Sequence, residues 1–211
     1  QQVGLRLLKE TNAEFIIGID EVGTGSWVGP FTVAAVVAHR NWQPRKDVRD
    51  SKKLTRTQRE YLVDTYLMPP EIETAWVIHI GQEEFTSFGI GMAVKRAFNR
   101  IAITALAEYP DSIVVADGEY APYATSSVTS IAFPRADDIV PACSAASILG
   151  KVTRDKLMAG YDKQYPGYGW AANCGYGTKA HREALQRLGI TPLHRRSFKS
   201  IKEYLRSQGC V

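Results

Sequence analysis

Residues 14–39, EFIIGIDEVGTGSWVGPFTVAAVVAH, contain the two apolar runs that decide the fold. The runs at residues 14–20 and 31–39 are short and rich in Ile, Val and Ala, a pattern that predicts buried β-strands. The first run ends in Asp20 and Glu21, and three glycines lie between it and the second run. Because glycines mark turns, we expect the chain to leave the first strand at these two acids.

The remaining apolar patterns predict an α/β domain. The first predicted helix has Thr55 as a suitable N-cap and ends before Pro69-Pro70, and the second ends before Pro110. Further strands are predicted at residues 73–80, 112–117 and 127–133. Helices are predicted at residues 55–68, 91–108, 140–161, 179–188 and 197–207. Strands interleaved with helices indicate a mixed sheet covered by helices.

Composition is typical of one folded domain over residues 1–211. The apolar fraction is 45% and the charged fraction 23%, which excludes a disordered or fibrous chain. Three cysteines are too few for a disulfide framework and favour a reducing, cytoplasmic location. We expect no membrane association, because no apolar run approaches the roughly 18 residues of a membrane span, and the N-terminal QQVGLRLLKE has no signal-peptide pattern.

Charge is distributed unevenly along the chain. Residues 149–206 contain 12 Lys and Arg against 4 Asp and Glu, whereas residues 1–148 contain 14 against 18. A basic C-terminal third indicates either a polyanionic partner or an ordinary solvated surface. Charge alone does not separate these two interpretations.

Acidic residues stand where two of the predicted strands end. Asp20 and Glu21 end the first strand, and Asp117 ends the strand at residues 112–117. A further pair, Asp137 and Asp138, precedes the predicted helix at residues 140–161. Converging carboxylates repel one another unless Mg²⁺ or Mn²⁺ lies between them, and two such ions can hydrolyse a phosphodiester. Each acid also has a structural interpretation, as a turn, a helix cap or a solvated strand end.

Several other residues are of types that contact nucleic acids. Glycines allow a ligand to approach the backbone, Lys and His can contact phosphates, and an aromatic ring can stack on a base or sugar. The structural alternatives are a turn, a solvated surface and a partly buried ring. The candidates are Gly23, Thr24, Gly25, Tyr176, His181 and His194, together with Lys52 and Lys53, which belong to the segment that begins at Asp50.

Seven motifs follow one another along nearly the whole chain. They are GIDEVGTGSWVGP (18–30), RDSKKLT (49–55), ADG (116–118), ADDIVPACSAASILGKVTRD (136–155), YPGYGW (165–170), GYGTKAH (175–181) and HRRSF (194–198). In this order they resemble type 2 ribonuclease H, also called ribonuclease HII. The resemblance implies a ribonuclease H-like mixed five-stranded sheet flanked by helices, with a basic helical C-terminal extension at about residues 165–211.

The resemblance also implies an activity and a metal centre. The enzyme would be an endoribonuclease that hydrolyses the RNA strand of RNA/DNA hybrids and ribonucleotides embedded in duplex DNA, leaving 3′-hydroxyl and 5′-phosphate ends. It would use two divalent ions, Mg²⁺ or Mn²⁺. Separately from the resemblance, we expect a monomer. The family's four catalytic and metal-binding acids map onto Asp20, Glu21, Asp117 and Asp137, and Asp155 matches a further acid near the second metal.

Substrate contacts are carried over in the same way. Gly23, Thr24 and Gly25 match the loop that reads the 2′-hydroxyl, Lys52 and Lys53 match backbone contacts, and Tyr176 matches the ring that packs on the sugar at an RNA–DNA junction. In the basic C-terminal third, Arg195 and Arg196 are expected to contact phosphates.

Two departures from the family pattern place junction specificity in question. Thr24 replaces the usual Arg of a Gly-Arg-Gly loop, which resembles the type 3 branch, and Asn173-Cys174 replaces the usual His-Lys.

Three alternatives compete with this interpretation. A non-catalytic RNA/DNA hybrid-binding protein would keep the basic surface and lose an acid, but all four mapped acids are present. A phosphoesterase for small phosphates, or a glycosidase with paired carboxylates, leaves the basic third unexplained.

Overall fold

The computed structural model describes residues 2–49, 51–122 and 128–209, and contains one five-stranded mixed sheet. The strand order is β3-β2-β1-β4-β5; β1 pairs antiparallel with β2 and parallel with β4. The β2–β3 pair is antiparallel and the β4–β5 pair is parallel. The strands are β1 (Phe15–Val22), β2 (Phe31–His39), β3 (Thr74–Ile80), β4 (Ser112–Asp117) and β5 (Ser130–Phe133). The predicted sheet is confirmed.

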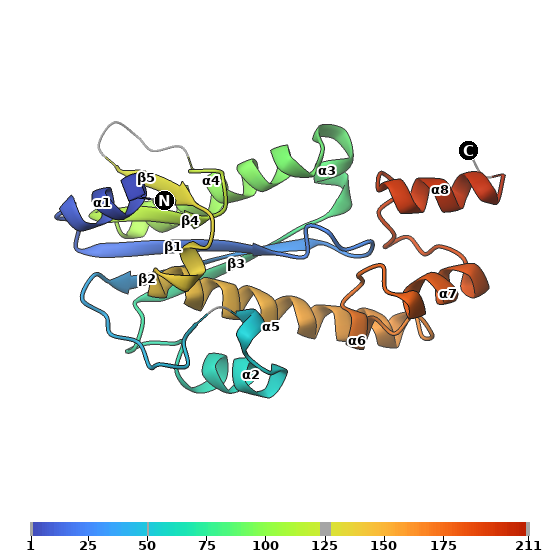
Figure 1. The fold of residues 1–211 in the computed structure, drawn as a ribbon, viewed down its shortest axis with the longest axis horizontal. Helices are drawn as coiled ribbons and strands as arrows, with labels where there is room; N and C mark the ends of the chain where they lie inside the picture. Colours follow the sequence, from blue (N-terminus) through green and yellow to red (C-terminus); the bar gives the residue numbers. More distant parts are fainter. Residues whose placement is uncertain (1, 50, 123–127, 210–211) are drawn as a thin grey trace.

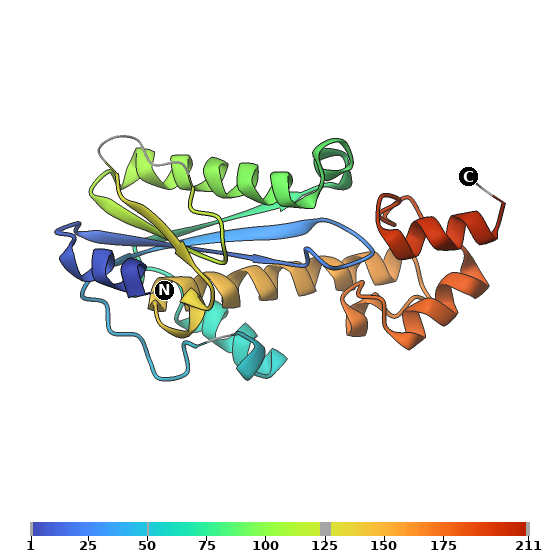
Figure 2. The same cartoon turned by 45° about the horizontal axis from the view of Figure 1, so that its top comes forward.

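Helices cover both faces of the sheet and extend the molecule beyond one end. Figures 1 and 2 show α3 and α4 on one face, α2 and α5 on the other, and α6, α7 and α8 beyond the end of the sheet. The described helices are α1 (Gln2–Glu10), η1 (Ser51–Lys53), α2 (Arg56–Thr65), α3 (Gln82–Phe88), α4 (Ile90–Glu108), η2 (Ala136–Asp138), α5 (Pro141–Gln164), α6 (Trp170–Asn173), α7 (Lys179–Leu188) and α8 (Lys199–Ser207). None of them is long and apolar enough to cross a membrane.

The two faces of the sheet follow from the alternation of side chains along β2. Val33 and Val37 pack in the cluster that contains α4, whereas Ala34 and Val36 pack in the cluster that contains α2 and α5. A strand buried on both sides reads as a continuous apolar run, as residues 31–39 do. In β1, Gly18 lets α5 approach closely, because a Cβ there would lie 2.2 Å from the Ala142 carbonyl carbon.

Most predicted elements coincide with the observed ones. β2, β4 and α7 have the predicted bounds, and α2 begins after Thr55 in a capping box with Gln58. β5 begins at Ser130; Ser127 in the predicted strand lies outside the described residues. Helices α1, α3 and α6 are not predicted; α3 and α6 have only seven and four residues, too few turns for a periodic pattern.

Candidate active site

Strands β1 and β4 bring two of the acids together. Ile19 and Ala116 are the last residues that pair between β1 and β4, so Asp20 and Asp117 follow side by side. The chain does not leave the first strand at Asp20 and Glu21 as expected, because both acids still pair with β2 and β1 continues to Val22. Each of Asp20, Asp117 and Asp137 offers one carboxylate oxygen, and these three oxygens lie within 4.8 Å of one another. Asp20 and Asp137 are buried and Asp117 is half-buried. We call these three residues the acid cluster.

Asp137 reaches the acid cluster through η2 and the first turn of α5. The Ser144 hydroxyl donates to the Asp137 carbonyl at 2.5 Å, and the Ala136 amide donates to Asp117 Oδ1 at 2.7 Å. Asp138 points elsewhere and forms ion pairs with Lys53 and Arg135. Of the two acids that the sequence left open, Asp137 is therefore the one in the cluster.

Burial and mutual repulsion shape the protonation of this site. Burial, followed by the charge of Glu21, raises the pKa of Asp20 well above its usual value. Burial and then the charge of Asp117 raise the pKa of Glu21 to about 7. Asp20 is oriented by the Glu21 amide, at 2.7 Å, and by the Ser147 hydroxyl. A set of hard carboxylate oxygens whose charges oppose one another fits a divalent cation such as Mg²⁺ or Mn²⁺.

Glu21 faces the opposite side of the sheet from Asp20, because side chains alternate along a strand. Its side chain lines a cavity of about 270 Å³ between α4 and the end of β4. Thr24, Asp117 and Tyr120 also line this cavity. We call residues 23–30, which connect β1 to β2, the glycine loop. Its Thr24 therefore lines the same cavity as two of the candidate acids, Glu21 and Asp117.

Arg154 holds the glycine loop from inside. Gly23 has φ +87°, and a Cβ at this position would lie 2.1 Å from Arg154 Nε, so both the conformation and the space require glycine. Arg154 is fully buried and donates to the carbonyls of Pro30, at 3.0 Å, and Cys174, at 2.9 Å. This guanidinium thus joins the glycine loop to the segment before Tyr176.

Tyr176 lies beside the glycine loop. A Cβ built on Gly25 would lie 3.9 Å from Tyr176 Cε1, and the Tyr176 residue is 37% exposed. Its carbonyl contacts His181 Nδ1 at 3.0 Å. The ring is therefore available to a ligand lying along the loop.

The two lysines belong to η1, next to the acid cluster. The charge of Lys52 lowers the pKa of Glu21, in opposition to burial, and Lys53 pairs with Asp138. Ser51 fixes this segment to α5, since its hydroxyl lies 2.9 Å from that of Ser147. Asp50 lies outside the described residues.

Comparison with known proteins identifies the family to which this chain belongs. The model of the ribonuclease HII family matches residues 17–201. The ribonuclease HII of Ruegeria pomeroyi is 42% identical over 190 residues, covering 90% of this chain and 78% of that protein. The chain belongs to the ribonuclease HII family. It is an endoribonuclease, as the resemblance implied.

Other relatives agree with this assignment. The ribonuclease HII of Dichelobacter nodosus is 39% identical, covering 91% of this chain and 98% of that protein. Two solved structures share the fold. The PCNA:RNase HII complex from Archaeoglobus fulgidus gives a TM-score of 0.67 at 24% identity, covering 88% and 94% of the two chains. Bst-RNase HIII in complex with Mn²⁺ gives 0.69 at 17% identity, covering 95% and 72%.

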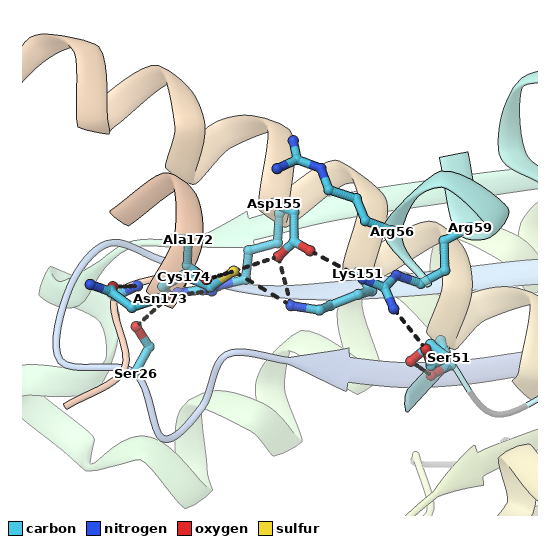
Figure 3. A network of polar contacts seen from close by, with 12 residues as sticks. Ser26, Ser51, Arg56, Arg59, Lys151, Asp155, Ala172, Asn173 and Cys174 are labelled. Atoms are coloured by element: carbon cyan, nitrogen blue, oxygen red, sulfur yellow. Dashed lines mark hydrogen bonds and ion pairs between the residues drawn. The ribbon is translucent and has the colours of Figure 1, made fainter. Parts of the chain in front are cut away.

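Two residues lie away from the positions expected: Asp155, carried over from ribonuclease HII, and Arg195, predicted from the basic C-terminal third. The structure does not bring Asp155 to the acid cluster; its carboxylate contacts Lys151, Cys174 and Arg59 instead (Figure 3). Arg195 is fully buried, so of the two arginines expected to contact phosphate only Arg196 has an exposed side chain.

Arg195 holds the glycine loop from the side of the C-terminal extension. It donates from Nε to the Gly29 carbonyl and from Nη1 to the Thr24 carbonyl, both at 2.8 Å. Burial, followed by the charge of Arg154, lowers the pKa of Arg195 to about 9. The sequence offers no signal for this role, because a buried arginine and a surface arginine look alike in a basic segment.

His181 and His194 form a buried pair, so their interpretation as phosphate contacts or surface residues is wrong. Both are fully buried, with 3.4 Å between their Nε2 atoms. The Thr191 amide donates to His194 Nδ1 at 2.9 Å, and the Trp170 indole donates to His181 Nε2 at 3.2 Å. Both rings therefore accept hydrogen bonds and are neutral.

Proposed function

We propose that this ribonuclease HII hydrolyses the RNA strand of RNA/DNA hybrids and ribonucleotides embedded in duplex DNA, leaving 3′-hydroxyl and 5′-phosphate ends. The acid cluster carries the proposal, because it gathers carboxylates from β1, β4 and η2 within 4.8 Å. The cytoplasmic location and the monomeric state stay predictions.

Four acids of this chain would hold two divalent ions, Mg²⁺ or Mn²⁺: Asp20, Asp117 and Asp137 through their carboxylates, and Glu21 through its side chain, its backbone carbonyl or both. When bound, such ions supply an activated water and stabilise the charge on the leaving 3′ oxygen. The residues around the cluster hold the carboxylates in place before substrate arrives. Ser147 and the Glu21 amide fix Asp20, and the Ala136 amide fixes Asp117.

The glycine loop and Tyr176 would select the ribonucleotide. Thr24 lines the same cavity as Glu21 and Asp117, and Gly25 lies beside the Tyr176 ring. A 2′-hydroxyl both donates and accepts hydrogen bonds, so exposed backbone groups of the loop can distinguish RNA from DNA. Lys52, Lys53 and Arg196 would contact the phosphate backbone.

Cleavage of a labelled RNA/DNA hybrid tests the proposal. The wild type should cut only when Mn²⁺ or Mg²⁺ is added, and Asp137→Asn should lower kcat at least about 10³-fold, equivalent to about 4 kcal/mol of transition-state stabilisation. Asp138→Asn is the matched control; it lies outside the cluster and should stay within about fivefold of wild type. Full activity of Asp137→Asn would refute the metal-site assignment, and hybrid binding without cleavage by wild type would favour the non-catalytic alternative.

Thr24 provides a separate test of substrate preference. An Arg would offer charged, forked donors to a phosphate beside a lone ribonucleotide, whereas Thr offers one uncharged hydroxyl. We expect wild type to cut a duplex with four ribonucleotides about tenfold faster than one with a single ribonucleotide, and Thr24→Arg to narrow that ratio. Equal rates for wild type on both duplexes, unchanged in Thr24→Arg, would show that Thr24 does not set the preference.

A further inference from the structure

The Asp155 carboxylate joins three parts of the molecule (Figure 3). Oδ1 accepts from Lys151 Nζ at 2.7 Å and from the Cys174 thiol at 3.1 Å. Oδ2 lies 3.7 Å from Arg59 Nη2. Lys151 is on α5, Arg59 on α2, and Cys174 follows α6. The Asp155 residue is 6% exposed, so these contacts form largely away from solvent.

Arg59 connects Asp155 to the lysine segment. Its Nη1 donates to the Ser51 carbonyl at 2.9 Å and to the Leu54 carbonyl at 2.6 Å. These two carbonyls flank Lys52 and Lys53. A shift of Arg59 would therefore move both proposed phosphate contacts.

Cys174 connects Asp155 to the Tyr176 segment. Its carbonyl accepts from Ser26 Oγ at 3.2 Å and from Arg154 Nη1 at 2.9 Å. Cys174 has φ +50°, a left-handed conformation that a non-glycine residue keeps only where its surroundings fix it. The hydrogen bond from the Cys174 thiol to Asp155 is one of the contacts that fix the backbone two residues before Tyr176.

We propose that Asp155 is a positioning residue, which sets the Tyr176 segment relative to Lys52 and Lys53 and does not ligate a catalytic metal. Both carboxylate oxygens are engaged by cations or by the thiol, which leaves the carboxylate compensated without a metal. The inference rests on the proposed function, because it assigns both segments to the binding of one nucleic acid. It predicts that loss of Asp155 weakens substrate binding and spares the metal centre.

Asp155→Asn is the direct test, since it keeps the shape of the side chain and removes the charge. KM for a labelled hybrid should rise about tenfold and kcat should stay within about twofold of wild type. Mn²⁺ affinity, measured by calorimetry without substrate, should not change. Asp64→Asn is the matched control; Asp64 also pairs across α2 and α5, with Lys156 at 3.5 Å, but its side chain is 61% exposed. It should behave as wild type.

A second substitution separates positioning from general weakening. In wild type, Tyr176→Ala should raise KM; in the Asp155→Asn background the same change should raise it less, because the ring is already displaced. Independent, multiplicative effects of the two substitutions on KM would overturn the proposal, as would weakened Mn²⁺ binding or a loss confined to kcat in Asp155→Asn.

If Asp155→Asn does not fold, Cys174→Ala tests the proposal in its place. It should raise KM about threefold at unchanged kcat, and an unchanged KM overturns the proposal. Failure of wild type to cut any hybrid would instead refute the proposed function, and the Mn²⁺ titration would still show whether Asp155 is a metal ligand.

Discussion

Asp20 and Asp155 are two aspartates of similar burial in opposite electrostatic surroundings: Asp20 is on β1, which packs against α5, and Asp155 is on α5 itself. Asp20 is 8% exposed and Asp155 is 6% exposed. The neighbours of Asp20 are Glu21 and Asp117, whose charges oppose its ionisation, whereas Asp155 has Lys151 and Arg59. Burial alone therefore does not make a metal site. A carboxylate becomes available to a metal where its nearest charged neighbours are acids, as for Asp20, and not cations, as for Asp155.

The largest effect that tests the comparison between Asp20 and Asp155 is the stabilisation of the folded protein by a bound metal ion. Mn²⁺ at about 100 times its Kd should raise the free energy of unfolding of wild type by about 2.7 kcal/mol, because it binds only the folded acid cluster. Asp117→Asn should abolish most of this gain. Urea unfolding in EDTA and in Mn²⁺ measures it.

Asp138→Asn is the control for that experiment. Asp138 is next to Asp137 in the chain but pairs with Lys53 and Arg135, so its substitution should leave the Mn²⁺ effect unchanged. An equal loss in Asp138→Asn would mean that the cluster is not the site where the metal binds.

An effect of comparable size concerns the C-terminal extension, in which His194 is buried in its neutral form. Burial, followed by the proximity of His181, lowers the pKa of His194 from 6.5 to about 4. The unfolded chain therefore binds a proton that the folded chain does not, so stability falls as pH drops from about 6.5 to about 4. Because each unit of pKa difference corresponds to about 1.4 kcal/mol, we expect this to contribute about 3 kcal/mol.

His194→Asn isolates that contribution, since the Asn carbonyl can still accept from the Thr191 amide. The difference in unfolding free energy between wild type and His194→Asn should change with pH over this interval and level off below about pH 4. A difference that is constant from pH 7 to pH 4 would show that His194 does not titrate upon unfolding.

The sequence was sufficient for the features of the site that depend on local pattern. Apolar runs ending in acids predict Asp20 and Asp117 on neighbouring strands, and β1 and β4 confirm this, although β1 continues to Val22 beyond its acids. It did not distinguish Asp137 from Asp138, because the choice depends on Lys53 and Arg135, which draw Asp138 aside.

The burial of Arg154 and Arg195 is the other feature that the sequence did not predict. Both bind carbonyls of residues 24–30, which are more than 120 positions away in the chain. No pattern in a basic segment indicates which cation will find such partners, so the sequence predicts phosphate contact for Arg195 and Arg196 alike. Position and chemistry predicted the acids, whereas the contacts that hold the loops needed the tertiary structure.

The smallest effect is also the sharpest test of the comparison between Asp20 and Asp155. Removing a charged neighbour should change the free energy of unfolding in opposite directions at the two sites. In EDTA, Asp117→Asn should raise the free energy of unfolding by about 1 kcal/mol, since it removes repulsion toward Asp20 and Glu21 while the amide oxygen still accepts from Ala136. Lys151→Met should lower it by about 1 kcal/mol, because it removes a cation that compensates the buried Asp155 and whose side chain is only 22% exposed. Urea denaturation of the two variants at pH 7.5 measures both. If both substitutions destabilise, the acid cluster is not under electrostatic strain without metal; if neither does, Asp20 and Asp155 differ in neighbours but not in energy.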